Sequence, residues 1–193
     1  QDVWPESFSA VLPVLKKIPH NLLPFAGRAN AAYRAADALV AVSQTYLDRA
    51  HEANPNAPGE VVYIGADFDT LERVQAKTFS DGLTHFFYLG TLSFSYDMET
   101  VCKGVQKLLN AGEKVALHIM GGGPDLEKLK AYANESILFY GYVPYAEMMA
   151  VAKGCDIAVN PIQSHSAASI TNKLSDYMAL QKPILNSQVN DEV

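Results

Sequence analysis

Lys173 and Asp176 are the two residues whose types and spacing most clearly suggest chemistry. They follow a segment of small and polar residues, 160–169, and lie in the first two turns of a helix predicted over 171–181. Free N–H groups at a helix N-terminus attract phosphate, and a lysine beside them adds positive charge. The pattern therefore predicts an anion site. Asp176, one turn further on, is placed to accept the hydroxyl groups of a sugar.

The same spacing also has a structural interpretation. Residues three apart share one helix face, so Lys173 and Asp176 could pair with each other for about 0.2–0.5 kcal/mol. A lysine at the positive end of a helix dipole is otherwise unfavourable, however, and an anionic ligand would explain its presence. We therefore favour the binding site over the simple pair.

A parallel β-sheet is the element that would position this helix. From about residue 83, short apolar strands alternate with amphipathic helices, which is typical of a sheet covered on both faces. This predicts an α/β, doubly wound domain of the Rossmann type. Strands are predicted at 86–89, 115–120, 137–140, 157–159 and 183–185, and helices at 97–110, 124–133, 145–153 and 171–181.

Ligands of such sheets bind beyond the carboxyl ends of the strands. The candidate binding residues there are Gly90, Thr91, Gly122, Gly123, Pro124, Tyr142, Val143, His165, Ser169, Ile170, Thr171 and Asn172. Each turn is a weak signal by itself, because Gly121–Gly123 could serve only to make a tight turn. The spacing of these glycines is also not that of a dinucleotide-binding fingerprint.

Other reactive side chains have simpler explanations. His118 lies between apolar neighbours and is predicted to be a packed core residue, and Tyr96 and Asp97 are predicted to begin and cap a helix. His165 could donate to a phosphate or a sugar hydroxyl, although a structural role is favoured. Cys102 and Cys155 are predicted to be buried free thiols, which fits a reducing, cytoplasmic compartment.

The first part of the chain has a different character. Four prolines between residues 5 and 24 predict short helical pieces. Lys16 and Lys17 beside apolar residues could contact an anionic membrane surface, but a helix packed on its own domain is the favoured interpretation. A strand at 38–42, a helix at 44–53 capped by Ser43, and a strand at 61–64 follow. Residues 68–82 are predicted to connect two domains.

Composition limits the classes of function. The chain has 193 residues, of which 49% are hydrophobic and 19% charged, as expected of a folded protein. A net charge of −6 argues against a general nucleic-acid binder. No metal-ligand spacing is present, and no apolar run approaches the roughly 20 residues of a membrane-spanning helix. The chain begins without methionine, within a motif, so a fragment of a longer protein is expected.

The segment 169–184, which reads SITNKLSDYMALQKPI, resembles the S-x-P-N-K-L-x-E/D-Y-x-A-x-G-K-P-I segment of group-1, or family 4, retaining glycosyltransferases. Five further segments are similar to motifs of that family, in the same order. They are DVWPES at 2–7, Asp37–Ser43, Tyr88–Leu92, Gly121–Pro124 and Phe139–Val143. The DVWPES segment is similar to members that build surface polysaccharides.

The resemblance implies a GT-B fold of two Rossmann-like domains. Residues 1–75 would be the end of the acceptor-side domain, 76–82 a linker, and 83–193 most of the donor domain. It also implies the catalytic residues: Lys173 would neutralise the departing diphosphate and Asp176 would hold the ribose hydroxyls. Gly90 and Thr91 would assist at the phosphates, the base would lie near Tyr142 and Val143, and the sugar would meet the loop ending at Thr171.

The implied function is transfer of a sugar from a nucleoside diphosphate, with UDP favoured, to a saccharide or lipid-linked acceptor, with retention. No metal or other cofactor is expected. Glu6 could face the acceptor, or it could serve only to pack its turn. The enzyme is expected in the cytoplasm or at the inner face of the membrane. Two alternatives are a nucleotide-sugar-binding module without transferase activity and an isomerase similar to UDP-sugar 2-epimerases.

Three positions depart from the family pattern. Ala168 stands where the first of two acidic residues is common, Thr171 where proline is usual, and Gln181 where glycine is usual at the helix end. The phosphate-binding arginine that often follows the first strand is also missing. These differences give Lys173 a larger share of phosphate binding and leave the donor sugar open.

Overall fold

The computed structural model describes residues 5–6, 12–163 and 170–188. These residues form two compact units, and the chain passes from the first to the second between Ile64 and Gly65. Residues 65–82 therefore group with the second unit, although the sequence assigns them to the end of the first domain and a linker. The assignment of acceptor and donor roles to 1–75 and 83–193 remains a prediction.

The first unit is built around two short parallel strands, β1 and β2. Ser43 caps α3 as predicted, since its hydroxyl accepts from the Tyr46 amide at 3.3 Å. The second strand lies at 59–61 rather than 61–64, because pairing with β1 selects this register and leaves Val62 and Tyr63 exposed. The elements are η1 (Pro13–Lys17), η2 (His20–Leu22), α2 (Ala26–Arg34), β1 (Leu39–Ala41), α3 (Gln44–Ala53) and β2 (Gly59–Val61).

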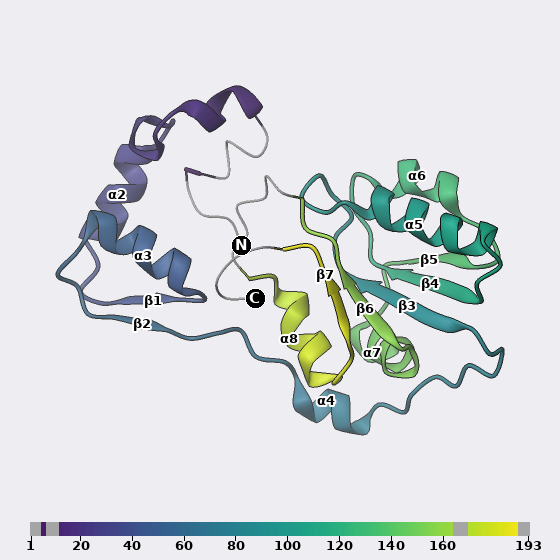
Figure 1. Ribbon diagram of the computed structural model, residues 1–193. Helices are drawn as coiled ribbons and strands as arrows, with labels where there is room; N and C mark the ends of the chain where they lie inside the picture. The colour runs from purple at the N-terminus through teal and green to yellow at the C-terminus, as the bar shows by residue number, and fades with distance from the viewer. Residues whose placement is uncertain (1–4, 7–11, 164–169, 189–193) are drawn as a thin grey trace. The chain divides into compact units, whose positions relative to one another are not determined.

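The second unit contains a five-stranded parallel sheet, as predicted, in the order β5-β4-β3-β6-β7 (Figure 1). Its strands are β3 (Thr84–Leu89), β4 (Val115–Met120), β5 (Ile137–Gly141), β6 (Ile157–Asn160) and β7 (Ile184–Asn186). The chain moves outward from β3 to β5 and then returns to the other side of β3. The strand order therefore reverses between β3 and β6, which is where sheets of this kind bind ligands.

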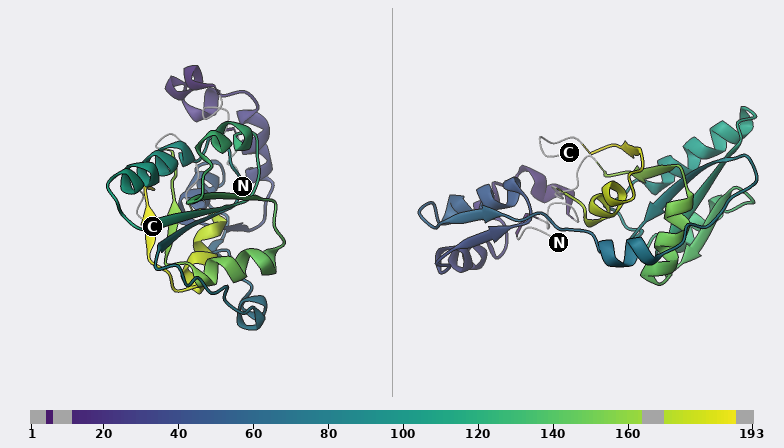
Figure 2. Two further views of the ribbon diagram at one scale, coloured as in Figure 1. Left: turned by 90° about the vertical axis from the view of Figure 1, so that its right-hand side faces the viewer. Right: turned by 90° about the horizontal axis from the view of Figure 1, so that it is seen from below.

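The helices of this unit cover both faces of the sheet, and Figures 1 and 2 show α5 and α6 on one face and α7 on the other. The unit contains α4 (Phe68–Arg73), α5 (Met98–Asn110), α6 (Leu126–Leu129), η3 (Lys130–Tyr132), α7 (Tyr145–Gly154) and α8 (Asn172–Ala179). The interpretation of 68–82 as connector missed α4, which Asp67 caps by accepting from the Thr70 amide at 3.0 Å. Asp97 caps α5 in the same way, as predicted.

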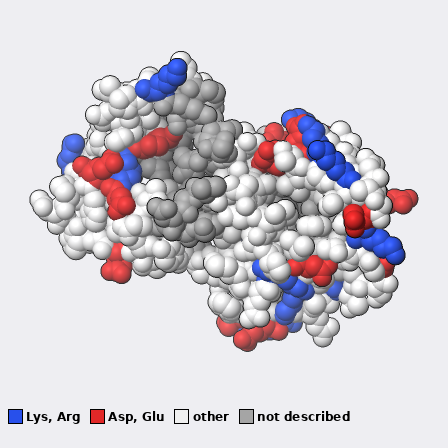
Figure 3. Space-filling model, viewed as in Figure 1, with Lys and Arg blue, Asp and Glu red and all other residues white. Residues whose placement is uncertain are grey.

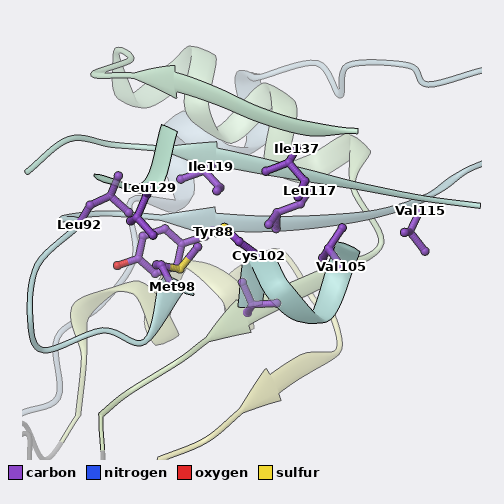
Figure 4. Packing of buried hydrophobic residues seen from close by; sticks show 11 residues of the cluster. Tyr88, Leu92, Met98, Cys102, Val105, Val115, Leu117, Ile119, Leu129 and Ile137 are labelled. Carbon is purple, nitrogen blue, oxygen red and sulfur yellow. The ribbon is translucent and has the colours of Figure 1, made fainter. Parts of the chain in front are cut away.

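The core beneath α5 and α6 combines apolar side chains from these helices with side chains from alternate strand positions (Figure 4). It includes Val115, Leu117 and Ile119 of β4, which point to the same face because strand side chains alternate. Cys102 lies in this core and Cys155 is also buried, so both are free thiols as predicted. Burial raises the pKa of Cys102 to about 11 and of Cys155 to about 12, so neither is an activated nucleophile.

His118 is a packed core residue, as predicted, and it belongs to a buried chain of hydrogen bonds. Its two ring nitrogens lie 2.8 Å from His85 Nδ1 and 2.8 Å from the Tyr140 hydroxyl, and His85 Nε2 lies 3.0 Å from Asp81. One proton assignment satisfies all three contacts. Tyr140 donates to His118, His118 donates to His85, and His85 donates to Asp81, with both imidazoles neutral.

Burial of His118 in this chain of hydrogen bonds makes the free energy of unfolding depend on pH in the acid range. Desolvation lowers the pKa of His118 from 6.5 to about 4, with smaller electrostatic contributions from His85 and Lys77. Between these values the unfolded chain binds the proton and the folded chain does not, so stability is lost as pH falls from 6.5 toward 4. The loss reaches about 3 kcal/mol. Urea unfolding at several pH values should show a shallower loss for His118→Gln; equal slopes would contradict this account.

Gln181 stands where the family usually has glycine, and its backbone still has a left-handed conformation, with φ +56°. This left-handed conformation at a helix end favours glycine. We expect Gln181→Gly to raise the free energy of unfolding by about 1 kcal/mol. Gln106→Gly, within α5, is the matched control and should lower it by about 1 kcal/mol. Chemical denaturation measures both, and a destabilised Gln181→Gly would refute the strain.

Candidate functional site

Backbone hydrogen bonds join the three predicted strand-end turns into one surface. The amide of Gly90 donates to Met120, that of Leu92 to Gly122, and that of Gly121 to Gly141, at 2.8–2.9 Å. The turns after β3, β4 and β5 are therefore adjacent. The predicted residues Gly90, Thr91, Gly122, Gly123, Pro124, Tyr142 and Val143 belong to or directly follow these turns.

The three consecutive glycines have different roles. Gly121 has φ +141°, and a Cβ there would lie 1.9 Å from the Gly90 carbonyl oxygen. Gly123 has φ +149°, and its Cβ would lie 2.2 Å from the carbonyl oxygen of Leu92. Close packing against the backbone therefore explains why both positions are glycine. A Cβ at Gly122 would meet nothing within 4 Å, so packing does not explain that glycine. Gly122 keeps its interpretation as a residue that lets a ligand approach.

Lys173 reaches the turn after β3 from the first turn of α8. A Cβ built at Gly90 would lie 3.3 Å from the lysine Cε and 3.7 Å from its Nζ. The ammonium lies 3.3 Å from the Tyr88 hydroxyl oxygen, which in turn donates to the Thr91 carbonyl at 2.7 Å. The predicted cation is thus located at the carboxyl end of β3, beside the reversal of strand order.

Two tyrosine rings surround this ammonium. Lys173 Nζ lies 3.4 Å from the ring centroid of Tyr96 and 4.7 Å from that of Tyr88. The lysine is 8% exposed, and burial lowers its pKa from 10.5 to about 7. In the described part of the chain it forms no ion pair with a carboxylate, and cation–π attraction supports its charged form instead.

Within the described residues, Asp176 does not form the pair with Lys173 that was the alternative to a binding site. Its carboxylate accepts from the Tyr145 hydroxyl at 2.7 Å instead. Desolvation raises the pKa of Asp176, while the hydrogen bond from Tyr145 acts in the opposite direction. Tyr145 therefore orients a half-buried carboxylate, and in the part of the chain that the structure describes its second oxygen accepts no hydrogen bond.

Helix α8 is fixed to the sheet by Tyr177, which is completely buried. The Tyr177 hydroxyl accepts from the Leu89 amide at 3.0 Å and donates to the Val159 carbonyl at 3.2 Å. Its ring packs edge-on against Phe87, with centroids 5.2 Å apart. One side chain thus attaches the helix to both β3 and β6.

The remaining predicted site residues fall into three groups. Tyr142 is 91% exposed. Directly before α8, Ile170 is half-buried and Thr171 is buried, whereas Asn172 at the start of the helix is exposed. His165, Ser169 and Ala168 lie outside the described residues. Glu6 forms an ion pair with Arg49 in the first unit, and Arg49 also donates to Asn30 at 2.9 Å. Its predicted acceptor-side role is untested by this contact.

Sequence reasoning missed the partners of the two key residues. Tyr88 was assigned only to a strand motif and Tyr96 only to the start of a helix, yet both contact the lysine. Tyr145 was counted only as part of a helix. The available signal was the turn 90–97, which contains two aromatic residues but no cation.

The described residues contain no group of three His, Cys, Asp or Glu side chains that could hold a metal ion. This finding does not test the expectation of a metal-free site, which remains a prediction. In the same residues, no helix combines the length and apolar character needed to cross a membrane. Acidic and basic side chains are interspersed on the face of the second unit that Figure 3 shows. Glu99 forms ion pairs with Lys103 and Lys128.

A family model described as Glycosyl transferases group 1 matches residues 84–193. An uncharacterized glycosyltransferase of Methanocaldococcus jannaschii is 25% identical over 169 residues, which cover 80% of this chain and 42% of that relative. The chain thus spans less than half the length of this curated relative.

Solved structures show the same fold. The lipopolysaccharide outer core galactosyltransferase WaaB aligns with a TM-score of 0.58 and 22% identity, covering 81% of this chain and 45% of its own. HepE of Anabaena, solved with UDP, aligns at 0.63 and 16%, covering 81% and 47%. WaaG, a glycosyltransferase of lipopolysaccharide biosynthesis, aligns at 0.64 and 12%, covering 96% and 54%. These alignments confirm the predicted GT-B-type fold class.

Proposed function

The chain belongs to the group 1 glycosyltransferases, and from this membership we propose that it carries the donor site of an enzyme using a UDP-sugar. The reaction is transfer of the sugar to a saccharide or lipid-linked acceptor, with retention of configuration. HepE, a protein of the same fold, was solved with UDP, which supports the choice of nucleotide. A nucleotide-sugar donor and two free buried thiols fit a cytoplasmic setting.

The observation that carries the proposal is the position of Lys173. Its ammonium is buried at the carboxyl end of β3, beside the backbone of Gly90 and the start of α8. A diphosphate that reaches this point meets a cation and the positive end of the α8 dipole. No carboxylate among the described residues competes for the lysine, so its charge is available to the ligand.

Catalysis follows from stabilisation of the leaving group. When the bond between the sugar and the diphosphate breaks, negative charge develops on the β-phosphate. Lys173 is the predicted partner of that charge. Because burial brings its pKa to about 7, the diphosphate itself would favour the protonated lysine on binding.

Asp176 is the proposed partner of the ribose. Its carboxylate is held by Tyr145, and an acceptor oriented in this way can bind two vicinal hydroxyl groups. Tyr142, which is highly exposed after β5, and the unhindered backbone at Gly122 are proposed to lie beside the base.

Calorimetry on the 193-residue chain tests the donor site. UDP should bind more tightly than UMP, which lacks the β-phosphate, and more tightly than GDP. Asp176→Asn should weaken UDP binding about 10-fold. Glu127→Gln, an exposed carboxylate on α6, is the matched control and should bind UDP normally. Equal affinities for UDP and UMP would refute the diphosphate site.

Transfer is tested in the longer protein with a UDP-sugar and a candidate acceptor. NMR of the first-formed product reports whether the anomeric configuration is retained. Binding of UDP without transfer would favour the nucleotide-sugar-binding module, and conversion of the donor sugar without an acceptor would favour the isomerase.

A further inference from the structure

Tyr96 places its ring face closest to the Lys173 ammonium, 3.4 Å from centroid to Nζ. The Tyr88 ring lies 4.7 Å away and stands edge-on to the Tyr96 ring, with centroids 5.9 Å apart at 68°. The ammonium therefore lies against two aromatic surfaces. Aromatic faces carry partial negative charge and attract cations most strongly where water is excluded.

The Tyr96 ring is held in place by the backbone on both sides of it. The Tyr96 amide donates to the Ser93 carbonyl at 2.9 Å, and the Asp97 amide donates to Pro161 at 2.7 Å. Tyr96 also forms an isolated antiparallel bridge with Ile162. The segment after β3 is thus fastened to the segment after β6, across the reversal of strand order. A ring fixed in this way is a stable surface for a flexible lysine.

The chemical character of this surface matters for an anion site. A carboxylate beside Lys173 would keep the lysine charged but would repel the two phosphates of the donor. A neutral ring supports the cation without adding a net negative charge. The titratable groups that contact the ammonium among the described residues are the hydroxyl-bearing Tyr88 of β3 and Tyr96 of the segment before α5.

We infer that Tyr96 is a positioning residue of the donor site, whose ring keeps Lys173 charged and directed at the turn after β3 for a diphosphate ligand. This inference rests on the proposed function and assigns to Tyr96 a role that its place before the α5 cap did not suggest. This role belongs to the ring of Tyr96, and the ammonium of Lys173 donates its hydrogen bond to the Tyr88 hydroxyl.

The direct test measures the titration of Lys173 without any nucleotide. Lysine amino groups labelled with ¹⁵N are followed by NMR, and the Lys173 signal is assigned by its loss in Lys173→Met. In Tyr96→Leu the pKa of Lys173 should fall by about one unit, because the ring no longer supports the charge. Tyr96→Phe should titrate like the unaltered protein. Phe94→Leu, an exposed aromatic in the same turn, is the matched control and should also leave it unchanged.

A graded series avoids dependence on one variant. Phenylalanine with none, one, two or three fluorines at position 96 keeps the size of the ring while it weakens the negative face. The pKa of Lys173 should fall stepwise along this series. A titration that is the same in all four proteins, with Tyr96→Leu also unchanged, would overturn the inference.

The link to the ligand is tested by UDP affinity. At pH 7.5, Tyr96→Leu should bind UDP about 10-fold more weakly than the unaltered protein, and the ratio should approach one near pH 5, where the lysine is protonated in both. A ratio that does not change with pH would contradict the positioning role. If the unaltered chain does not bind UDP while the Lys173 titration still depends on the ring, the proposed function fails and the contact of Tyr96 with the lysine stands.

Discussion

Replacement of Lys173 by methionine should weaken UDP binding at least about 100-fold and, at the same time, make the protein more stable. Methionine fills a similar volume and removes the charge that the diphosphate requires. It also removes the cost of burying an ammonium that is only 8% exposed. We expect the free energy of unfolding at pH 7 to rise by roughly 1–4 kcal/mol. The contact with the tyrosine rings keeps this gain below what the pKa alone would give.

The sign of this effect can be checked against pH. The pKa of Lys173 is about 7 in the folded protein and near 10.5 in the unfolded chain. Below pH 7 the folded protein carries the full cost of the buried charge, and this cost disappears as pH rises through 10.5. The stability difference between Lys173→Met and the unaltered protein should therefore shrink between pH 7 and 10.5.

Lys103→Met is the matched control for this experiment. Lys103 is exposed on α5 and pairs with Glu99 at 2.7 Å. Its replacement should leave UDP affinity unchanged and alter stability far less than Lys173→Met does, because exposed ion pairs contribute little. If Lys173→Met were less stable than the unaltered protein at pH 7, the buried lysine would stabilise the fold. The interpretation that its burial lowers stability would then be wrong.

Gly121→Ala should lower the free energy of unfolding by roughly 3–5 kcal/mol. Its φ of +141° is open to glycine alone, and the added methyl would lie 1.9 Å from the Gly90 carbonyl oxygen. Backbone cannot move aside as a side chain can, so the turns after β3 and β4 would have to separate. UDP binding should be lost along with the packing of these turns.

Gly122→Ala is the matched control, because the same substitution one residue later meets nothing within 4 Å. Urea denaturation of the two variants, followed by circular dichroism, should show a change of less than about 1 kcal/mol for Gly122→Ala. Similar stabilities for the two variants would refute the close contact between the turns. Gly123→Ala, with φ +149°, offers a second measurement of the same kind.

The sheet was predictable from sequence because its signals are local. Apolar runs marked all five strands of the second unit, and Ser43 and Asp97 marked helix starts that the structure confirms. Helix α4 escaped detection because it is short and mixes charges with small residues, and the register of β2 depends on its pairing with β1. Such features depend on contacts that periodicity does not record.

The location of Lys173 was predicted, but its surroundings were not. A lysine at a helix start is visible in the sequence, whereas its contacts with Tyr88 and Tyr96 join positions 77 to 85 residues apart. The same is true of Asp176, whose hydrogen-bond partner Tyr145 lies 31 positions away. Spacing along one helix suggested a pair between Lys173 and Asp176, and the tertiary structure gave each residue an aromatic partner instead.

The attachment of α8 by Tyr177 has a consequence for the divergence of such enzymes. Because one hydroxyl ties the helix to β3 and β6, the sheet itself fixes the helix that carries the lysine. A substitution on the surface of the second unit that leaves Tyr177 intact should therefore leave the position of Lys173 unchanged. Separating the anchor of a helix from the ligand-facing side chains it carries would allow substrate preference to change without disturbing the sheet.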